Sequence, residues 1–171
     1  MNLHDVFLNA SLVWHQMWKT PIPQHEATLE DMLLLSASDH FRYERIWVAL
    51  LAVLTEAWQS QAMSAVRGYV ASVADSSGLE RILDSYQTDG RLERIKSCRH
   101  YMFHRDRREY WDAGRQAPIG AFLDVEALYE EFSRVLLAAM QAAGQERMRQ
   151  GISMPGPGER SFPWPETKPE A

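Results

Sequence analysis

The chain is poor in cysteine and in long apolar runs, and each shortage excludes a class of protein. With one cysteine, Cys98, among 171 residues, it has neither a disulfide framework nor a cysteine-based zinc site, and it suits a reducing compartment. The most apolar stretch, residues 46–54, is far shorter than the ~20 residues that span a membrane. No basic segment followed by an apolar run opens the chain, so no signal peptide is expected. These features predict a soluble, cytoplasmic protein with no membrane partner.

The common catalytic signatures are also missing from the sequence. It contains no glycine-rich phosphate loop, no G-x-S-x-G elbow, no H-E-x-x-H and no Cys/His metal spacing. His100 and His104 are four residues apart, a spacing that places two imidazoles on one helix face, but no third ligand is evident nearby. We therefore expect no bound metal and no cofactor.

What the sequence does have is apolar residues at helical spacing. Its 46% hydrophobic and 11% aromatic content excludes a disordered or fibrous protein, and its length is that of one domain. No run alternates with period two, so no strand is predicted. We expect an all-α bundle of about five to seven helices over residues 1–150. The helices are expected at residues 3–17, 28–35, 41–63, 66–73, 77–86, 91–104 and 124–149.

The longest of these, residues 41–63, is apolar over a wide arc and is predicted to be a buried central helix. We expect it to pack against residues 124–149 through Leu50, Leu51, Leu54, Phe132, Val135 and Met140. At its start lies a polar cluster, which either lines a groove or is a solvated first turn: Asp39, His40, Arg42, Tyr43 and Glu44.

Helix boundaries are expected at recognisable turn and capping residues. Ser77 with Glu80 matches a capping box at the start of residues 77–86, and Thr28 with Asp31 matches another. The Thr88-Asp89-Gly90 turn is predicted to end one helix and to cap the next.

The C-terminal segment differs in composition from the rest. Residues 151–171 hold five of the eight prolines and three of the nine glycines, without apolar periodicity. This composition predicts an extended or disordered tail. Its Phe162-Pro163-Trp164-Pro165 stretch either docks in a polyproline conformation or belongs to an unstructured terminus.

Positive charge is concentrated in one segment of an acidic chain. Residues 91–115 contain eight Lys or Arg against four Asp or Glu, whereas the whole chain has a net charge of -5. Tyr101, Phe103, Tyr110 and Trp111 are interleaved with these charges. The pattern suits an anionic ligand such as RNA. The alternative is that a basic helix end merely complements the helix dipole.

Within this segment, Arg99-His100-Tyr101-Met102-Phe103-His104 resembles the R-x(4–6)-H motif of the HEPN superfamily. The resemblance covers six residues as a motif and residues 1–150 as a general plan of several helices. It implies a helical bundle and, as in many members, a metal-independent endoribonuclease that leaves 2′,3′-cyclic phosphate ends. It further implies a homodimer in which the motifs of two copies meet, a role in toxin–antitoxin systems or phage defence, and an antitoxin or nucleotidyltransferase partner.

The resemblance assigns catalytic roles to Arg99, His100 and His104. We expect the substrate RNA to be held by neighbouring basic and aromatic residues, and Glu56 to support the motif. The predicted substrate-binding residues are Arg105, Arg107, Arg108, Tyr101 and Tyr110.

The residue types fit this chemistry. Histidine titrates near pH 6.5 and can transfer protons, while the arginine fork can bind two phosphate oxygens. On an ideal helix Arg99 and His104 lie ~140° apart. A fraying helix end, or a second copy, would let them converge.

A structural interpretation of the same residues stays open. Arg99 would pair with an acid such as Glu56, which otherwise sits at the solvent edge of its helix, and His104 would cap a helix end. The chain would then be a non-catalytic helical domain that binds a nucleotide or a protein partner.

Overall fold

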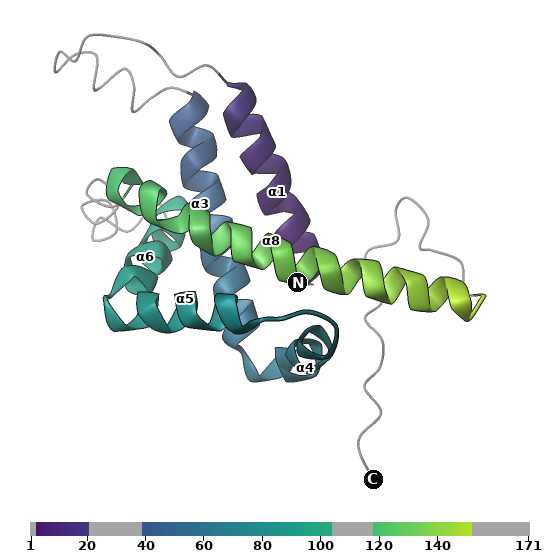
Figure 1. The fold of residues 1–171 in the computed structure, drawn as a ribbon. Coiled ribbons are helices and arrows are strands. Elements are labelled where there is room, and N and C mark those ends of the chain that lie inside the picture. Colours follow the sequence, from purple (N-terminus) through teal and green to yellow (C-terminus); the bar gives the residue numbers. More distant parts are fainter. Residues whose placement is uncertain (1–2, 21–38, 104–117, 152–171) are drawn as a thin grey trace, which may run out of the picture.

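The computed structural model describes residues 3–20, 39–103 and 118–151 (Figure 1). Its elements are α1 (Leu3–Lys19), α3 (Asp39–Gln59), the 3₁₀ turn η1 (Gln61–Met63), α4 (Ser64–Val73), α5 (Ser77–Thr88), α6 (Arg91–Phe103) and α8 (Pro118–Arg149). The described residues contain no strand, which confirms the all-α prediction. The helix predicted at residues 28–35 and almost all of the predicted tail lie outside these ranges. Of the helices described, none is long and apolar enough to cross a membrane.

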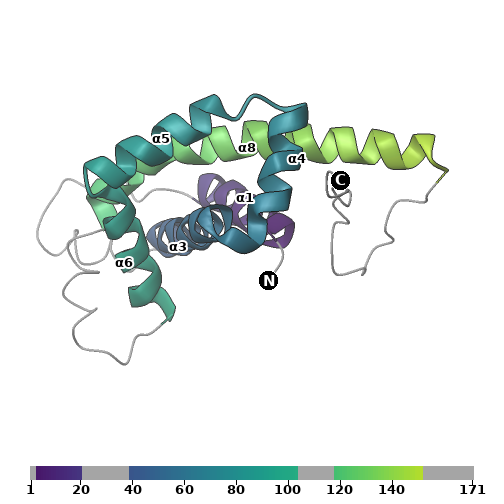
Figure 2. The ribbon, with the colours of Figure 1, turned by 90° about the horizontal axis from the view of Figure 1, so that it is seen from below.

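Helix α3 occupies the centre of the fold. In two views at right angles it lies between α1 and α6, and α8 runs across the bundle (Figures 1 and 2). Its side chains Trp47, Leu51, Leu54 and Trp58 are fully buried. The predicted buried central helix is therefore confirmed. Burying such side chains supplies the main free energy of folding, about 1.5–3 kcal/mol for each large apolar residue.

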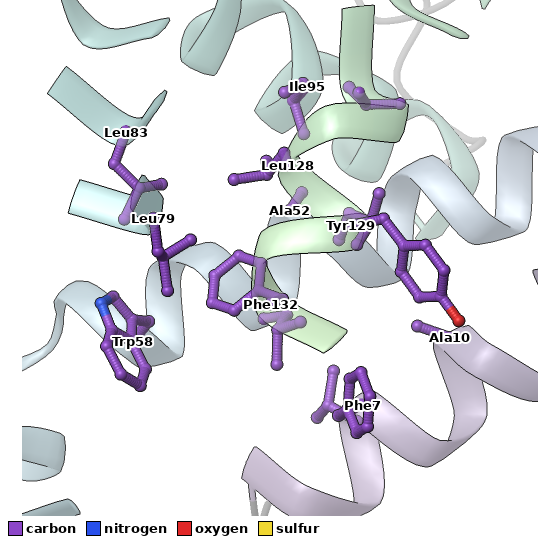
Figure 3. Packing of buried hydrophobic residues seen from close by; sticks show 14 of the residues in the cluster. Phe7, Ala10, Ala52, Trp58, Leu79, Leu83, Ile95, Leu128, Tyr129 and Phe132 are labelled. Atoms are coloured by element: carbon purple, nitrogen blue, oxygen red, sulfur yellow. The ribbon is translucent and has the colours of Figure 1, made fainter. Parts of the chain in front are cut away.

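The core between α3 and α8 follows the predicted pattern. Leu51, Leu54, Phe132 and Val135 are fully buried in one cluster, and Leu50 and Met140 pack against it while partly exposed. The Trp58 and Phe132 rings meet edge to face, with centroids 6.0 Å apart. Figure 3 shows side chains of α1, α5 and α6 completing the same cluster.

The predicted helix at residues 41–63 is interrupted at Ser60. Its α-helical part ends at Gln59, and Ser60 is extended, with φ -68° and ψ 148°. Arg67 from α4 donates from Nη1 to the carbonyl oxygens of Trp58 and Ser60, the latter at 2.7 Å. These carbonyls at the helix end are thus satisfied by a side chain from the next α-helix, a cap that apolar spacing does not reveal.

The capping box predicted at Ser77 is wrong, although the helix itself is present. Ser77 lies inside α5, and its backbone N–H donates to Asp75 Oδ1 at 2.9 Å. Glu80 instead accepts a hydrogen bond from the indole N–H of Trp58 at 3.2 Å. The Glu80 carboxylate, which the sequence pattern predicts to cap α5, binds the buried Trp58 instead.

The next boundary was predicted correctly. Gly90 has a positive φ of 77°, a conformation that glycine adopts readily, and Asp89 Oδ1 accepts the N–H of Arg91 at 3.0 Å. Helix α8, however, begins at Pro118 rather than at residue 124. Proline is tolerated in a first helical turn, where its missing N–H has no intrahelical acceptor.

We expect Leu51→Ala to lower the free energy of unfolding by about 2–5 kcal/mol, because a fully buried side chain is replaced by a cavity. Urea unfolding followed by circular dichroism measures the loss. The control is Leu137→Ala on α8, whose side chain is 46% exposed and should change stability by less than about 0.5 kcal/mol. Equal losses in the two variants would contradict the central position of α3.

Candidate functional site

The arginine of the R-x(4–6)-H motif lies between two helices. Arg99 on α6 forms an ion pair from Nη1 to Oε2 of Glu56 on α3, and the two side chains are 23% and 32% exposed. The predicted support by Glu56 therefore corresponds to a direct contact. Glu56 can reach α6 because it lies at the edge of the α3 face that packs there, rather than pointing away from the bundle.

His100 contacts the same guanidinium group. Its Nε2 lies 3.1 Å from Arg99 Nη2. Because arginine only donates hydrogen bonds, Nε2 must accept, which requires a neutral imidazole with its proton on Nδ1. The structure thus joins Glu56, Arg99 and His100 in one chain of polar contacts across α3 and α6, which we call the Arg99 cluster.

Several predicted site residues lie outside the described part of the chain. They comprise His104, which directly follows the last residue of α6, and the predicted RNA-binding residues Arg105, Arg107, Arg108 and Tyr110. Tyr101 lies within α6, but its side chain is not among those described. The structure therefore brings Arg99, His100 and Glu56 together. The roles of the other predicted site residues stay predictions.

Much of the positive charge on α6 is paired with nearby acids. Arg91 contacts Asp89, with Nη2 and Oδ2 2.5 Å apart, and its guanidinium lies 4.0 Å from the centre of the Tyr86 ring. Lys96 pairs with Glu93 at 2.8 Å. Together with the Arg99–Glu56 pair, these contacts reduce the net positive field that the sequence suggests for this segment.

Part of the polar cluster at the start of α3 is buried, so the cluster as a whole is not a solvated first turn. His40 and Glu44 are only 4% and 3% exposed. The Nδ1 of His40 lies 3.1 Å from the carbonyl oxygen of Met17 and 3.3 Å from that of Thr20, and so ties α3 to the end of α1. A sequence signal was present, since His40 and Glu44 continue the three- and four-residue spacing of the buried residues Trp47 and Leu51.

Burial changes the acid–base properties of the groups at this end of α3. It raises the pKa of Glu44 to about 7, although the neighbouring Arg45 favours the charged form. The pKa of Cys98 on α6 is raised to about 11, first by burial and then by the charge of Glu44. The thiol therefore stays protonated at neutral pH, which argues against a nucleophilic role for Cys98.

A groove that the sequence did not indicate lies between α5 and α8. It has a volume of about 400 Å³ and includes Arg81, Tyr86, Arg91 and Glu131 in its lining. Gly78 also lines it, and a Cβ atom there would lie 2.6 Å from the Glu131 carboxylate, so a larger residue would require the Glu131 side chain to shift. The groove does not include any member of the Arg99 cluster.

Comparison with protein-family models, with curated proteins and with solved structures found no match to this chain. Its function is therefore inferred from its own residues. In the described part of the chain, no three His, Cys, Asp or Glu side chains are grouped to hold a metal ion.

We expect wild-type stability to fall as the pH rises from about 4.5 to about 7, because folded Glu44 keeps a proton that the unfolded chain releases. This difference in pKa between the folded and unfolded chains corresponds to about 3 kcal/mol in the free energy of unfolding once Glu44 is ionised. Glu44→Gln cannot ionise, so its stability relative to wild type should increase through that range. Urea unfolding of both proteins at a series of pH values isolates the effect of Glu44. A difference in stability between the two proteins that stays constant with pH would contradict this role of Glu44.

Proposed function

We propose that this chain is a HEPN-type, metal-independent endoribonuclease that cleaves RNA to 2′,3′-cyclic phosphate ends. The observation that carries the proposal is the Arg99 cluster, in which Glu56 and His100 both hold the arginine of the motif. We place the enzyme in the cytoplasm, and a toxin or phage-defence role with an antitoxin or nucleotidyltransferase partner belongs to the same proposal.

The geometry of Arg99 supports a role in binding phosphate. A guanidinium has five N–H donors, and the two contacts with Glu56 and His100 engage one on Nη1 and one on Nη2. Three donors remain on a side chain that is 23% exposed. An arginine fixed in this way loses little entropy on binding a phosphate, and its charge stabilises the pentacoordinate phosphorus of the transition state.

In the proposed reaction the RNA 2′-hydroxyl loses its proton to a base and attacks the adjacent phosphorus. The bond from phosphorus to the 5′-oxygen then breaks, and an acid protonates that oxygen. The products are a 2′,3′-cyclic phosphate and a 5′-hydroxyl. We assign the proton transfers to His104, phosphate stabilisation to Arg99, and positioning of Arg99 to Glu56, with His100 beside it. RNA binding is assigned to Arg105, Arg107, Arg108, Tyr101 and Tyr110.

The proposal includes a homodimer in which the segment from Arg99 to Trp111 lies at or beside the two-fold axis. A second copy would bring together motif residues that an ideal helix would hold apart. Light scattering that reports a monomer at micromolar concentration would count against this nuclease arrangement while leaving the fold unaffected.

The second candidate is a non-catalytic helical binding or scaffold domain. The Arg99–Glu56 pair favours it as well, because an ion pair between α3 and α6 also serves a purely structural purpose. The two functions differ in what Arg99 must do. A structural role needs only a cation opposite Glu56, whereas phosphate binding needs the planar fork of donors.

We expect His104→Ala to reduce RNA cleavage by about 10²–10⁴-fold, the usual effect of losing a proton-transfer group. Arg99→Ala should reduce it by about 10²–10³-fold, the usual effect of losing a group that stabilises charge in the transition state. Arg99→Lys should keep the pair with Glu56 and the melting temperature while losing most of the cleavage. Cleavage of a labelled RNA, with analysis of its end groups, is the measurement. EDTA should have no effect, and DNA should resist because it lacks the 2′-hydroxyl.

The matched control is Arg94→Ala, an exposed arginine on the same helix that should retain cleavage. Full activity of Arg99→Lys would show that the cation alone matters and would favour the structural role. If the wild type cuts no RNA and Arg99→Ala unfolds the protein, the scaffold function replaces the nuclease.

A further inference from the structure

Helix α1 has apolar residues on two opposite faces. One face, which includes Leu3, Phe7 and Ala10, is buried in the core against α3. On the other, Leu8 is 45% exposed and Leu12 is 67% exposed. An exposed helix face is normally polar, so two leucines on adjacent turns indicate a surface that a binding partner covers.

The residues around these leucines follow the spacing of a helix-pairing face. Asp5, Leu8, Leu12, His15 and Lys19 are separated by three, four, three and four residues. This repeat places them on one stripe, as in two-stranded coiled coils. We call these five residues the α1 stripe. Trp18, which is 54% exposed, lies beside it and meets Trp14 edge to face at 5.4 Å.

Other exposed apolar residues do not form such a stripe. On α8, Leu137 is 46% exposed and Met148 is 64% exposed, but eleven residues, about three turns, separate them. Val73 is the last residue of α4. Isolated residues of this kind are ordinary on protein surfaces. The α1 stripe is therefore the exposed helix face in the described structure that best fits a protein partner.

The charges on the α1 stripe indicate which partner fits. Asp5 lies at the N-terminal end, where its side chain is 42% exposed, and Lys19 lies at the C-terminal end. Two parallel copies would place like charges together. Two antiparallel copies place Leu8 beside the partner's Leu12 and Asp5 beside the partner's His15. The partner's Lys19 is then about one helical turn from Asp5.

We propose that the α1 stripe is a two-fold interface with a second copy of this chain, in which the two α1 helices run antiparallel. Each contact then occurs twice, as two-fold symmetry requires. Helix α3 lies between α1 and α6, so this interface is separate from the Arg99 cluster and does not rest on nuclease activity (Figures 1 and 2).

The size of the surface predicts a weak association. Helix α1 has 17 residues and is about 26 Å long. A single pair of such helices belongs to the small, transient class of interfaces. Dimerisation is therefore expected to depend on concentration.

The first test is sedimentation equilibrium of the full chain over a concentration series, with Leu12→Glu as the variant. The exposed leucine tolerates glutamate in the folded chain, so the helical circular dichroism should be unchanged while the average mass at high concentration falls well below that of the wild type, whether or not the Arg99 segments also pair. Leu137→Glu is the matched control on α8 and should keep the wild-type mass. A wild type that does not associate, or a mass that Leu12→Glu does not change, would overturn the proposal.

Charge reversal then tests the antiparallel direction. Asp5→Lys should weaken association, because the new lysine faces His15 and Lys19 of the partner subunit. Adding Lys19→Glu to that variant should restore association, since opposite charges again face each other. A double variant weaker than Asp5→Lys alone would exclude the antiparallel arrangement.

Discussion

Burial of one arc of α3 beneath α1, α6 and α8 is the constraint on which the rest of this structure depends. The arc holds two tryptophans and two leucines that are fully enclosed, so the three neighbouring helices must cover it simultaneously. Near the arc, Glu56 pairs with Arg99, and burial raises the pKa of Glu44. The Thr55 hydroxyl, by contrast, is buried with no hydrogen-bond partner among the described residues. The described members of the candidate site, Glu56, Arg99 and His100, lie where α3 meets α6.

Two acids on α3 show how their position relative to this arc sets their chemistry. Glu56 lies at the edge, about one third exposed, and pairs with Arg99. Glu44 lies within the buried stripe, and burial raises its pKa to about 7. An ionised carboxylate is stable beside a guanidinium but costs free energy in an apolar layer. Glu56 therefore suits the positioning of an arginine, whereas Glu44 makes stability depend on pH.

The sequence predicted features that depend on neighbours along the chain and missed those that depend on distant ones. The helices that cover α3 follow from apolar spacing, and the Asp89-Gly90 cap follows from local residue types. Arg67 binds the carbonyl oxygens at the break, and Glu80 binds Trp58 instead of capping its own helix. Spacing predicts that a residue faces inward but does not identify the group that it meets.

The sequence alone determined the all-α class, the buried stripe of α3 and the presence of an arginine and two histidines within six residues, because helical periodicity and residue types are local properties. Tertiary structure decided which acid meets Arg99, that His40 and Glu44 are buried, and that Leu8 and Leu12 remain exposed. These outcomes depend on how helices cross and which faces they cover. An amphipathic pattern specifies that a face is apolar, but only the packing of the whole bundle determines whether another helix covers it.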